Sequence, residues 1–370
     1  MIAGIDLQSN GDIMACDIII SGSGAFAARI AFDIAATARA RVSVIIASRN
    51  KISLDWIVTA ANARAKIFHS QAKFISCHLD LLQPDAASQL LVQYEPRIFV
   101  QAASVQTSSI IAKTGDAWSA LVREGGLSAT ALAQSAISLR VARAITGSGR
   151  PCHFINCSFP DVVNEIIAAE GHSVLCGLGN VGILSSVFAG ILDIDQSRIR
   201  VLAHYQNLAA FRQLPNERYG RAPRVWIDNQ EITNVFDYFH NVKLTPEPVI
   251  DISGATGVPL ILALSQGHDW SGHLPGPNGL PGGYPVRLKN TKIELDLPAG
   301  MSPDEAIQWN RQYELENGLI VDQQKRVHFT GLLQSSFKDN GLDFSDGFSI
   351  SDIDSVYLKI DQLRKRLENI

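Results

Sequence analysis

A short glycine turn between an apolar segment and an alanine-rich segment constrains the fold more than any other feature of the sequence. It lies within DIIISGSGAFAARIAFDIAATA, residues 17–38. The apolar run before the turn predicts a buried strand, and the alanine-rich run after it predicts a helix. A second apolar segment, RVSVIIASRN at residues 41–50, follows at the spacing of a β-α-β unit. This order predicts a parallel sheet with helices packed on it.

The turn has the pattern G-x-G-x-x-A, formed by Gly22, Gly24 and Ala27. The first glycine permits the tight bend, the second lets the backbone approach a pyrophosphate, and the small third residue lets helix and strand pack closely. The first N–H groups of the helix can then donate to phosphate oxygens. We therefore predict that a dinucleotide binds here; a turn that binds nothing is the alternative. The predicted contact residues are Gly22, Ser23, Gly24, Phe26 and Ala27.

The end of the second strand bears on which dinucleotide binds. Folds that prefer NAD usually carry an acidic residue there, which accepts a hydrogen bond from the ribose 2′-hydroxyl. This chain has Ser48, Arg49 and Asn50 instead. The Arg49 guanidinium could pair with a 2′-phosphate, so NADP is favoured over NAD. An ordinary surface role for Arg49 stays open.

Two more predicted strands, at residues 73–78 and 97–102, flank a predicted helix at residues 84–94. The segments CHLDLLQPDAASQLL and PRIFVQAAS resemble the NADP-binding half of saccharopine dehydrogenase-like and related opine-type reductases, over about the first 110 residues. Ala103 and Ser104 follow the second of these strands. Because they stand at its carboxyl end, they are expected to face the cofactor.

The stretch FINCSFPDVVNEIIAAEGHSVLCGLGNVG, residues 154–182, continues the alternation. Strands at residues 152–156, 172–180 and 199–207 are predicted to extend the same sheet. The order resembles the lactate/malate dehydrogenase superfamily and its relatives, the family 4 glycoside hydrolases. The residues that carry the resemblance are Asn156, Pro160, Asp161, Val162, Gly179, Asn180, Val181 and His204. It implies that Asn156 and Asp161 lie at the nicotinamide end of the cofactor and that His204 is the catalytic histidine.

The chain departs from both relatives at the residues that define their chemistry. The helix VGILSSVFAG, residues 181–190, lacks the Asp and Arg that orient the histidine and clamp a carboxylate in the dehydrogenases. Cys176 stands three positions before Gly179, where the metal-using glycosidases have a cysteine directly before the turn. We therefore predict hydride transfer to or from a C=O or C=N carbon of a small polar, carboxylate-bearing substrate, with His204 moving the proton. A non-redox hydrolase that uses NAD, or a dinucleotide-binding regulator without turnover, are the alternatives, and a structural role for His204 stays open.

The substrate side is predicted from residues 265–286. Dense glycine and proline there predict an ordered loop, which could serve as a lid. Its candidate substrate contacts are His273 and Tyr284, together with Asn180 from the preceding turn. The spacing of His268, Asp269 and His273 offers no third metal ligand, so no metal is predicted. One arginine of a cluster could clamp a carboxylate, although solvated arginines are the favoured interpretation; the cluster is Arg212, Arg218, Arg221 and Arg224.

Composition limits the remaining classes of function. The net charge is −4, and no basic stripe is present, which argues against nucleic-acid binding. No apolar run is long enough to span a membrane, the N-terminus does not resemble a secretory signal, and five scattered cysteines fit reduced thiols. We expect a cytoplasmic α/β protein that forms a homodimer. Its expected parts are a Rossmann-like, doubly wound domain at residues 1–200, an α+β substrate domain at 201–345, and a C-terminal helix at 346–370 that packs on the cofactor domain or on a partner subunit.

Overall fold

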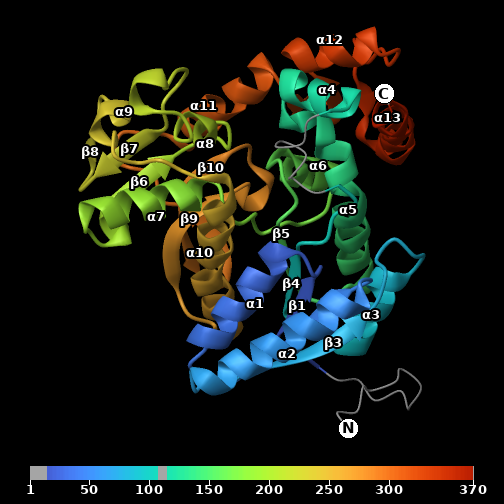
Figure 1. Cartoon of the computed structure of the whole chain (residues 1–370), viewed down its shortest axis with the longest axis vertical. Helices are drawn as coiled ribbons and strands as arrows, with labels where there is room; N and C mark the ends of the chain where they lie inside the picture. Colours follow the sequence, from blue (N-terminus) through green and yellow to red (C-terminus); the bar gives the residue numbers. More distant parts are fainter. Residues whose placement is uncertain (1–14, 107–114, 370) are drawn as a thin grey trace.

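The central element is a five-stranded parallel sheet with the strand order β3-β2-β1-β4-β5. It is seen in a computed structural model that describes residues 15–106 and 115–369 (Figure 1). The strands are β1 (Ile18–Ser21), β2 (Val42–Ser48), β3 (Ala72–His78), β4 (Ile98–Gln101) and β5 (His153–Asn156). Their residues are mostly buried, as expected for a parallel sheet covered on both faces. The predicted Rossmann-like fold is confirmed.

Side chains of β1 alternate between two apolar cores. Ile18 and Ile20 face the core shared with α1 (Ala25–Thr37), α2 (Lys51–Ile67) and α10 (Pro246–Gln266). Ile19 faces the opposite core, to which α3 (Ala86–Tyr94), α5 (Ala131–Ser148) and α6 (Val162–Glu170) contribute. Helices on both faces make this a doubly wound sheet.

The second half of the chain adds small antiparallel sheets and further helices. One sheet holds β6 (Ile199–Leu202), β7 (Arg224–Ile227) and β8 (Gln230–Glu231); another holds β9 (Trp270–Pro275), β10 (Gly283–Lys289) and β11 (Lys292–Leu295); a third holds β12 (Leu319–Val321), β13 (Arg326–Phe329) and β14 (Phe348–Ser349). The remaining α-helices are α4 (Ala117–Gly125), α7 (Val181–Leu192), α8 (Asn207–Ala210), α9 (Val235–Tyr238), α11 (Pro303–Glu316), α12 (Gly331–Asp339) and α13 (Ile353–Leu367). The C-terminal part therefore has the α+β character that the sequence predicts.

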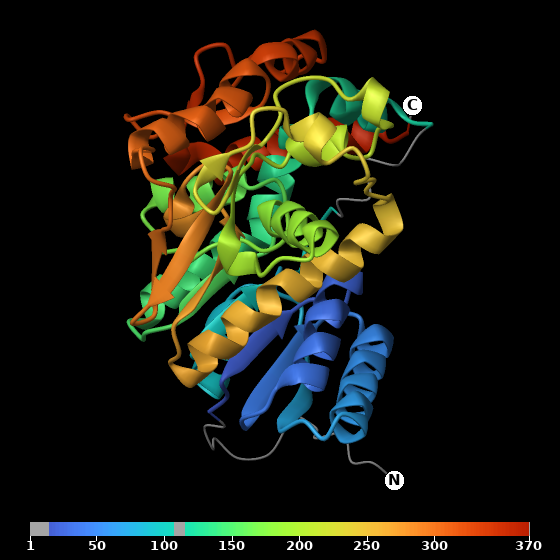
Figure 2. The ribbon, with the colours of Figure 1, turned by 90° about the vertical axis from the view of Figure 1, so that its left-hand side faces the viewer.

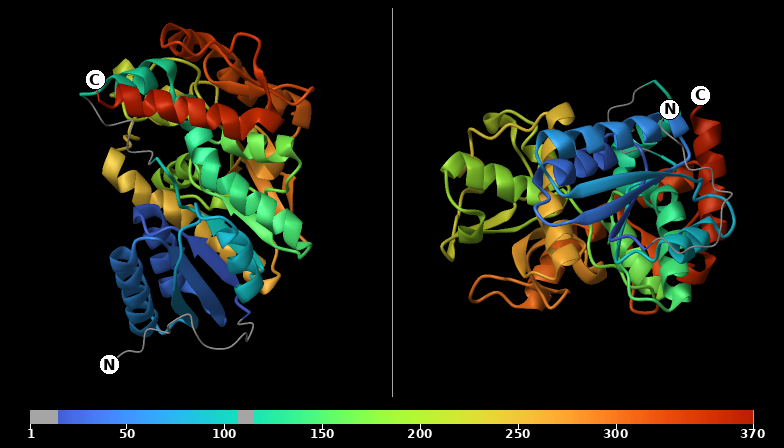
Figure 3. Two further views of the ribbon diagram at one scale, coloured as in Figure 1. Left: turned by 90° about the vertical axis from the view of Figure 1, so that its right-hand side faces the viewer. Right: turned by 90° about the horizontal axis from the view of Figure 1, so that it is seen from below.

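Two helices from the second half pack against helices that flank the N-terminal sheet. The helix α10 lies beside α1 (Figure 2). Arg29 of α1 forms an ion pair with Asp251 of α10. The C-terminal helix α13 packs against α5 on the other side of the molecule (Figure 3). The packing therefore does not follow a sequential boundary near residue 200. No helix in the described ranges is long and apolar enough to cross a membrane.

Two of the predicted sheet extensions are wrong. The segment at residues 172–180 contributes one isolated parallel bridge, between Ile155 and Cys176, rather than a strand. Pairing with β5 does not continue past Cys176, because the next N–H group, that of Gly177, donates to the Pro275 carbonyl at 2.7 Å. The strand β6 pairs antiparallel with β7 instead of joining the parallel sheet.

The predicted long loop at residues 265–286 is also wrong. Its two ends are β9 and β10, which pair antiparallel. The turn-forming residues are concentrated in the short connection between them, where Gly276, Asn278, Gly279 and Gly282 have positive φ angles. A high density of glycine and proline over the whole segment concealed the strands on either side of that connection.

Candidate functional site

The glycine turn brings the ends of β1 and β4 close together. Gly22 has φ +107°, and a Cβ on it would lie 3.0 Å from the carbonyl carbon of Ala102 and the nitrogen of Ala103. A side chain would therefore force the two strand ends apart. Because α1 follows β1 on one face and the chain after β4 leads to the other face, this is the position at which open α/β sheets bind ligands.

Gly24 leaves the start of α1 open. It is the N-cap of α1, and among the described residues no heavy atom lies within 4 Å of where its Cβ would be. No side chain of the described residues caps the helix, so its first N–H groups are left for a ligand, which suits a pyrophosphate. Ser23 fixes the turn from the side, because its hydroxyl lies 2.7 Å from that of Ser48 at the end of β2. Ala27 is buried against the sheet and Phe26 is half-buried.

The three residues after β2 have distinct contacts. The Asn50 side chain caps α2 by accepting from the Ser53 N–H at 3.1 Å. The Arg49 side chain is 61% exposed, and its Nη1 is 4.0 Å from an Asp80 oxygen. The Arg49 carbonyl lies 3.0 Å from Nε2 of His78. The guanidinium is therefore free to turn towards a ligand, although Asp80 competes for it.

The residues after β4 lie next to the glycine turn. The Ala103 carbonyl accepts from the side chain of Gln101 at 2.7 Å. The Ser104 hydroxyl donates to the carbonyl of Gln106 and accepts from its N–H. The backbone at Ala103 thus borders the cofactor turn, whereas the Ser104 side chain is directed into its own bend.

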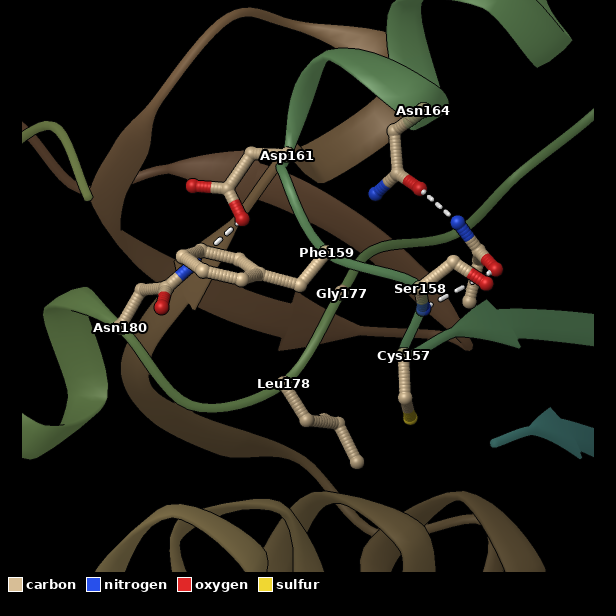
Figure 4. A pocket seen from close by; sticks show the side chains of 9 residues that line it. Cys157, Ser158, Phe159, Asp161, Asn164, Gly177, Leu178 and Asn180 are labelled. Atoms are coloured by element: carbon tan, nitrogen blue, oxygen red, sulfur yellow. Dashed lines mark hydrogen bonds between the residues drawn. The ribbon is translucent and has the colours of Figure 1, made fainter. Parts of the chain in front are cut away.

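At the end of β5, Asn156 is held by protein contacts. Its Oδ1 accepts from the Ser138 hydroxyl at 2.8 Å, and its Nδ2 donates to Oδ1 of Asn164 at 2.7 Å. These bonds tie β5 to α5 and α6. Beside them is a cavity of about 10 Å³, enough for one water molecule (Figure 4). It is lined by Asn156, Cys157, Ser158, Phe159, Asp161, Asn164, Gly177, Leu178 and Asn180.

Asp161 and Asn180 lie side by side in the lining of this cavity (Figure 4). The Asn180 side-chain N–H donates to Oδ1 of Asp161. Oδ2 of Asp161 is buried and has no hydrogen-bond partner among the described residues. Burial, followed by the negative charge of Glu314, raises the pKa of Asp161 to about 7, while the bond from Asn180 opposes the rise.

His204 is paired with a carboxylate that the sequence did not suggest. Its Nε2 is 3.1 Å from Oε1 of Glu314, and the two side chains are 1% and 2% exposed. Its Nδ1 accepts from the Gln206 N–H at 3.4 Å, and the Tyr313 ring stacks on the imidazole at 4.7 Å. Both ring nitrogens are therefore engaged. The carboxylate beside His204 thus comes from α11, and not from the helix after the second glycine turn.

The sequence carried a signal for Glu314. The buried positions of α11 are Ala306, Asn310, Tyr313 and Glu314, which lie on one helical face. A carboxylate on a buried face needs partners, and Glu314 has them. Its Oε2 accepts from the Ser128 hydroxyl at 3.0 Å and from the Leu319 N–H at 2.8 Å.

A third buried acid lies in α6. Glu165 of α6 forms a 2.7 Å ion pair with Arg311 of α11. Burial raises the pKa of Glu165 to about 7, and Arg311 opposes the rise. Within residues 15–106 and 115–369, no three His, Cys, Asp or Glu side chains are grouped so that they could hold a metal ion.

The other two predicted substrate contacts make structural bonds. Nε2 of His273 accepts from the Val201 N–H at 3.0 Å, and burial, with a smaller effect of Arg200, lowers the pKa of His273 to about 3. The Tyr284 hydroxyl donates to the Pro281 carbonyl at 2.6 Å. Both side chains are buried, and neither lines the cavity described above.

Most of the arginine cluster is committed to structure. Arg218 donates to backbone carbonyls, including that of Phe239 at 3.0 Å, and Arg221 and Arg224 form ion pairs with glutamates. Arg212 has no acidic partner in the described part of the chain, and burial lowers its pKa. Of the four, Arg212 is thus the one left to meet an anionic group.

The comparisons with known proteins concern the fold. No protein-family model and no curated protein matches the chain. The malate dehydrogenase of Picrophilus torridus in its apo form superposes with a TM-score of 0.53 at 12% identity, over 88% of this chain and 99% of that one. The malate dehydrogenase of Salinibacter ruber superposes with a TM-score of 0.50 at 11% identity, over 80% and 94%. The chain therefore has the fold of the malate dehydrogenases, which confirms the lactate/malate dehydrogenase-like resemblance at the level of the fold.

Proposed function

We propose that the protein is an NAD(P)-dependent oxidoreductase. Hydride would pass to or from the C=O or C=N carbon of a small polar substrate. The observation that carries the proposal is the open helix start at Gly24, where free N–H groups and unoccupied space lie beside the junction of β1 and β4. The shared fold with two malate dehydrogenases supports it.

The residues of the turn would hold the cofactor, which supplies the hydride when bound. The N–H groups after Gly24 would bind the pyrophosphate, and the adenosine half would extend over the end of β2. There the exposed Arg49 would meet a 2′-phosphate, which is why we propose NADP rather than NAD. The nicotinamide half would then extend past Ala103 towards the end of β5.

The substrate side would be the buried polar cluster beyond β5. Hydride transfer to a carbonyl requires that a proton reach the oxygen, and a positioned side chain supplies it most effectively. The cluster contains the His204–Glu314 pair and Asp161, from elements far apart in the chain. Arg212 would be the group for a substrate carboxylate, because its charge has no acidic partner in the described residues.

A dinucleotide-binding protein without turnover is the second candidate. It is favoured by two observations: both nitrogens of His204 are engaged, and the cavity beside Asp161 holds only about one water molecule. Such a protein would bind the nucleotide and reduce no substrate.

Nucleotide binding tests both candidates. We expect NADPH to bind more tightly than NADH in a fluorescence titration, and Arg49→Ala to reduce that preference about tenfold. Gly24→Ala places a methyl group in the open space and is expected to weaken both nucleotides at least about tenfold. Gly147→Ala is the matched control, because a Cβ there also meets nothing within 4 Å of the described residues. Binding of neither nucleotide by the wild-type protein would overturn the proposal.

A substrate screen then separates the two candidates. Oxidation of NADPH would be followed with a panel of 2-oxo acids, each with and without an added amine. Turnover supports the oxidoreductase, and dependence on the amine would indicate imine reduction. Tight nucleotide binding with no turnover across the panel would favour the binding protein.

A further inference from the structure

The side chain of Asp161 is not used by its own helix. Asp161 is the N-cap of α6, yet its carboxylate makes no capping bond to the helix, although Asp is among the residues preferred for that bond. One of its oxygens accepts from Asn180 instead (Figure 4), and the other is buried without a partner among the described residues. Asp161 is only 6% exposed. Burying its carboxyl group costs free energy, and the single hydrogen bond from Asn180 does not fully offset that cost.

Oδ2 of Asp161 is the atom of the cavity wall left without a partner. The amides of Asn156 and Asn164 bond to each other, and the Ser158 hydroxyl lies 2.8 Å from that of Ser138. Burial raises the pKa of the Cys157 thiol well above its usual value, so that group stays protonated. Among the described lining residues, Asp161 is therefore the acid that keeps a buried carboxylate oxygen without a protein partner.

His204 lacks such a free atom. Its Nε2 meets Glu314 and its Nδ1 meets the Gln206 N–H. The neighbouring Tyr205 hydroxyl is likewise engaged, 3.2 Å from that of Ser128. An incoming substrate oxygen would have to displace a buried protein contact to reach any of these groups.

We propose that Asp161, and not His204, exchanges the proton with the substrate. The inference rests on the proposed function. In the direction of reduction, the carbonyl carbon accepts hydride and the π electron pair moves to the oxygen. That oxygen takes the proton from Oδ2 of Asp161, which leaves an alcohol and a carboxylate. In the direction of oxidation the carboxylate takes the hydroxyl proton back.

The surroundings keep both forms of Asp161 accessible at neutral pH. Burial and then Glu314 of α11 raise its pKa to about 7, and Asn180 opposes them. Tyr205, on the segment after β6, belongs to the same cluster: burial and Glu314, with a smaller effect of Asp161, raise the pKa of its hydroxyl. A proton donor is most effective when its pKa lies near the working pH. The paired His204 and Glu314 then act as positioning residues that maintain this environment.

The inference predicts a charge linkage that does not require a substrate. The oxidised nicotinamide ring carries a positive charge and the reduced ring carries none. A carboxylate at Asp161 should therefore favour the oxidised nucleotide, and a protonated Asp161 should not. We expect the affinity ratio of NADP⁺ to NADPH to rise about tenfold between about pH 5.5 and 8.5, as for a pKa shift of about one unit. Any protein group whose titration affects the binding of both nucleotides equally leaves this ratio unchanged. If only NAD⁺ and NADH bind, the ratio is measured for that pair.

Three variants make the measurement specific. Asp161→Asn keeps the shape of the side chain and should make the ratio independent of pH. Glu165→Gln removes a buried acid of the same helix with a similarly raised pKa, but one paired with Arg311, and should leave the dependence intact. Asn180→Ala removes a bond that holds the pKa of Asp161 down, and should move the midpoint to higher pH. Thermal unfolding of each variant shows whether it is folded.

The outcomes separate this inference from the proposed function. If wild-type protein binds both nucleotides with a ratio that does not change with pH, or if Asp161→Asn retains the change, Asp161 is not the proton-exchanging group. If Asp161→Asn does not fold, Asn180→Ala provides the test. In that case, an unchanged midpoint of the pH dependence in Asn180→Ala would overturn the inference. If neither nucleotide binds, the proposed function falls and this inference falls with it.

Discussion

Glu314 shows why the chemistry of the site is harder to predict than its place. The glycine turn is local, so Gly22, Gly24 and Ala27 can be recognised from a few residues of sequence. Glu314 is 110 residues from His204, and only the folded chain brings their side chains to 3.1 Å. Helical spacing indicates that Glu314 is buried, but it contains no information about which side chain Glu314 meets. The same holds for the free oxygen of Asp161.

Glu314→Ala is expected to lower the free energy of unfolding by roughly 3–5 kcal/mol, because it leaves His204 and two buried donors without their acceptor. Urea unfolding followed by circular dichroism measures the loss. Glu316→Ala is the control two residues along: Glu316 is exposed and pairs with Arg221, so its removal should cost less than about 1 kcal/mol. Similar losses for the two variants would show that the buried pair does not stabilise the fold.

At the scale of elements, the parts that follow local rules are predictable. The strands β1, β2, β3 and β4 are apolar runs, and turn residues separate them from the helices that follow. The failures lie where tertiary contacts decide: residues 172–180 meet Pro275 and cannot continue as a strand, and β6 pairs with β7 instead of β5. In β9 and β10 the strands were hidden, because the glycines and prolines of their connection dominate the composition of the whole segment.

The start of α11 is an element that the sequence predicts in detail. Ser302 is the N-cap, and with Glu305 it forms a capping box, followed by Pro303 at the first turn. Ser302→Ala should therefore lower the free energy of unfolding by about 1 kcal/mol. Ser335→Ala on α12 is the control, because that exposed hydroxyl makes only a long 3.5 Å hydrogen bond to the Gly331 carbonyl. Its loss should change the free energy of unfolding by no more than about 0.5 kcal/mol. Equal effects in chemical unfolding would mean that the cap contributes nothing.

At the scale of the whole molecule, the two halves of the sequence meet in both cores that cover the central sheet. Ile18 and Ile30 from the first half pack in the same cluster as Val258 and Ile261 of α10. The candidate site is shared in the same way: the cofactor turn comes from the first half, and Glu314 comes from α11. Nucleotide bound at Gly24 would therefore stabilise elements that lie more than 200 residues away in the sequence.

These shared cores predict that the full chain unfolds in one transition. In calorimetry the van't Hoff and calorimetric enthalpies should agree, and NADPH at about a hundred times its Kd should stabilise the whole chain by about 2.7 kcal/mol. Gly254→Val should lower the temperature of that single transition, because a Cβ on Gly254 would lie 2.6 Å from Cγ of Arg29 on α1. Gly190→Val, a helical glycine whose Cβ would meet nothing within 4 Å of the described residues, corrects for the helix propensity of valine. A separate first transition that alone responds to NADPH and to Gly254→Val would show instead that the cofactor-binding half folds independently of α10 and α11.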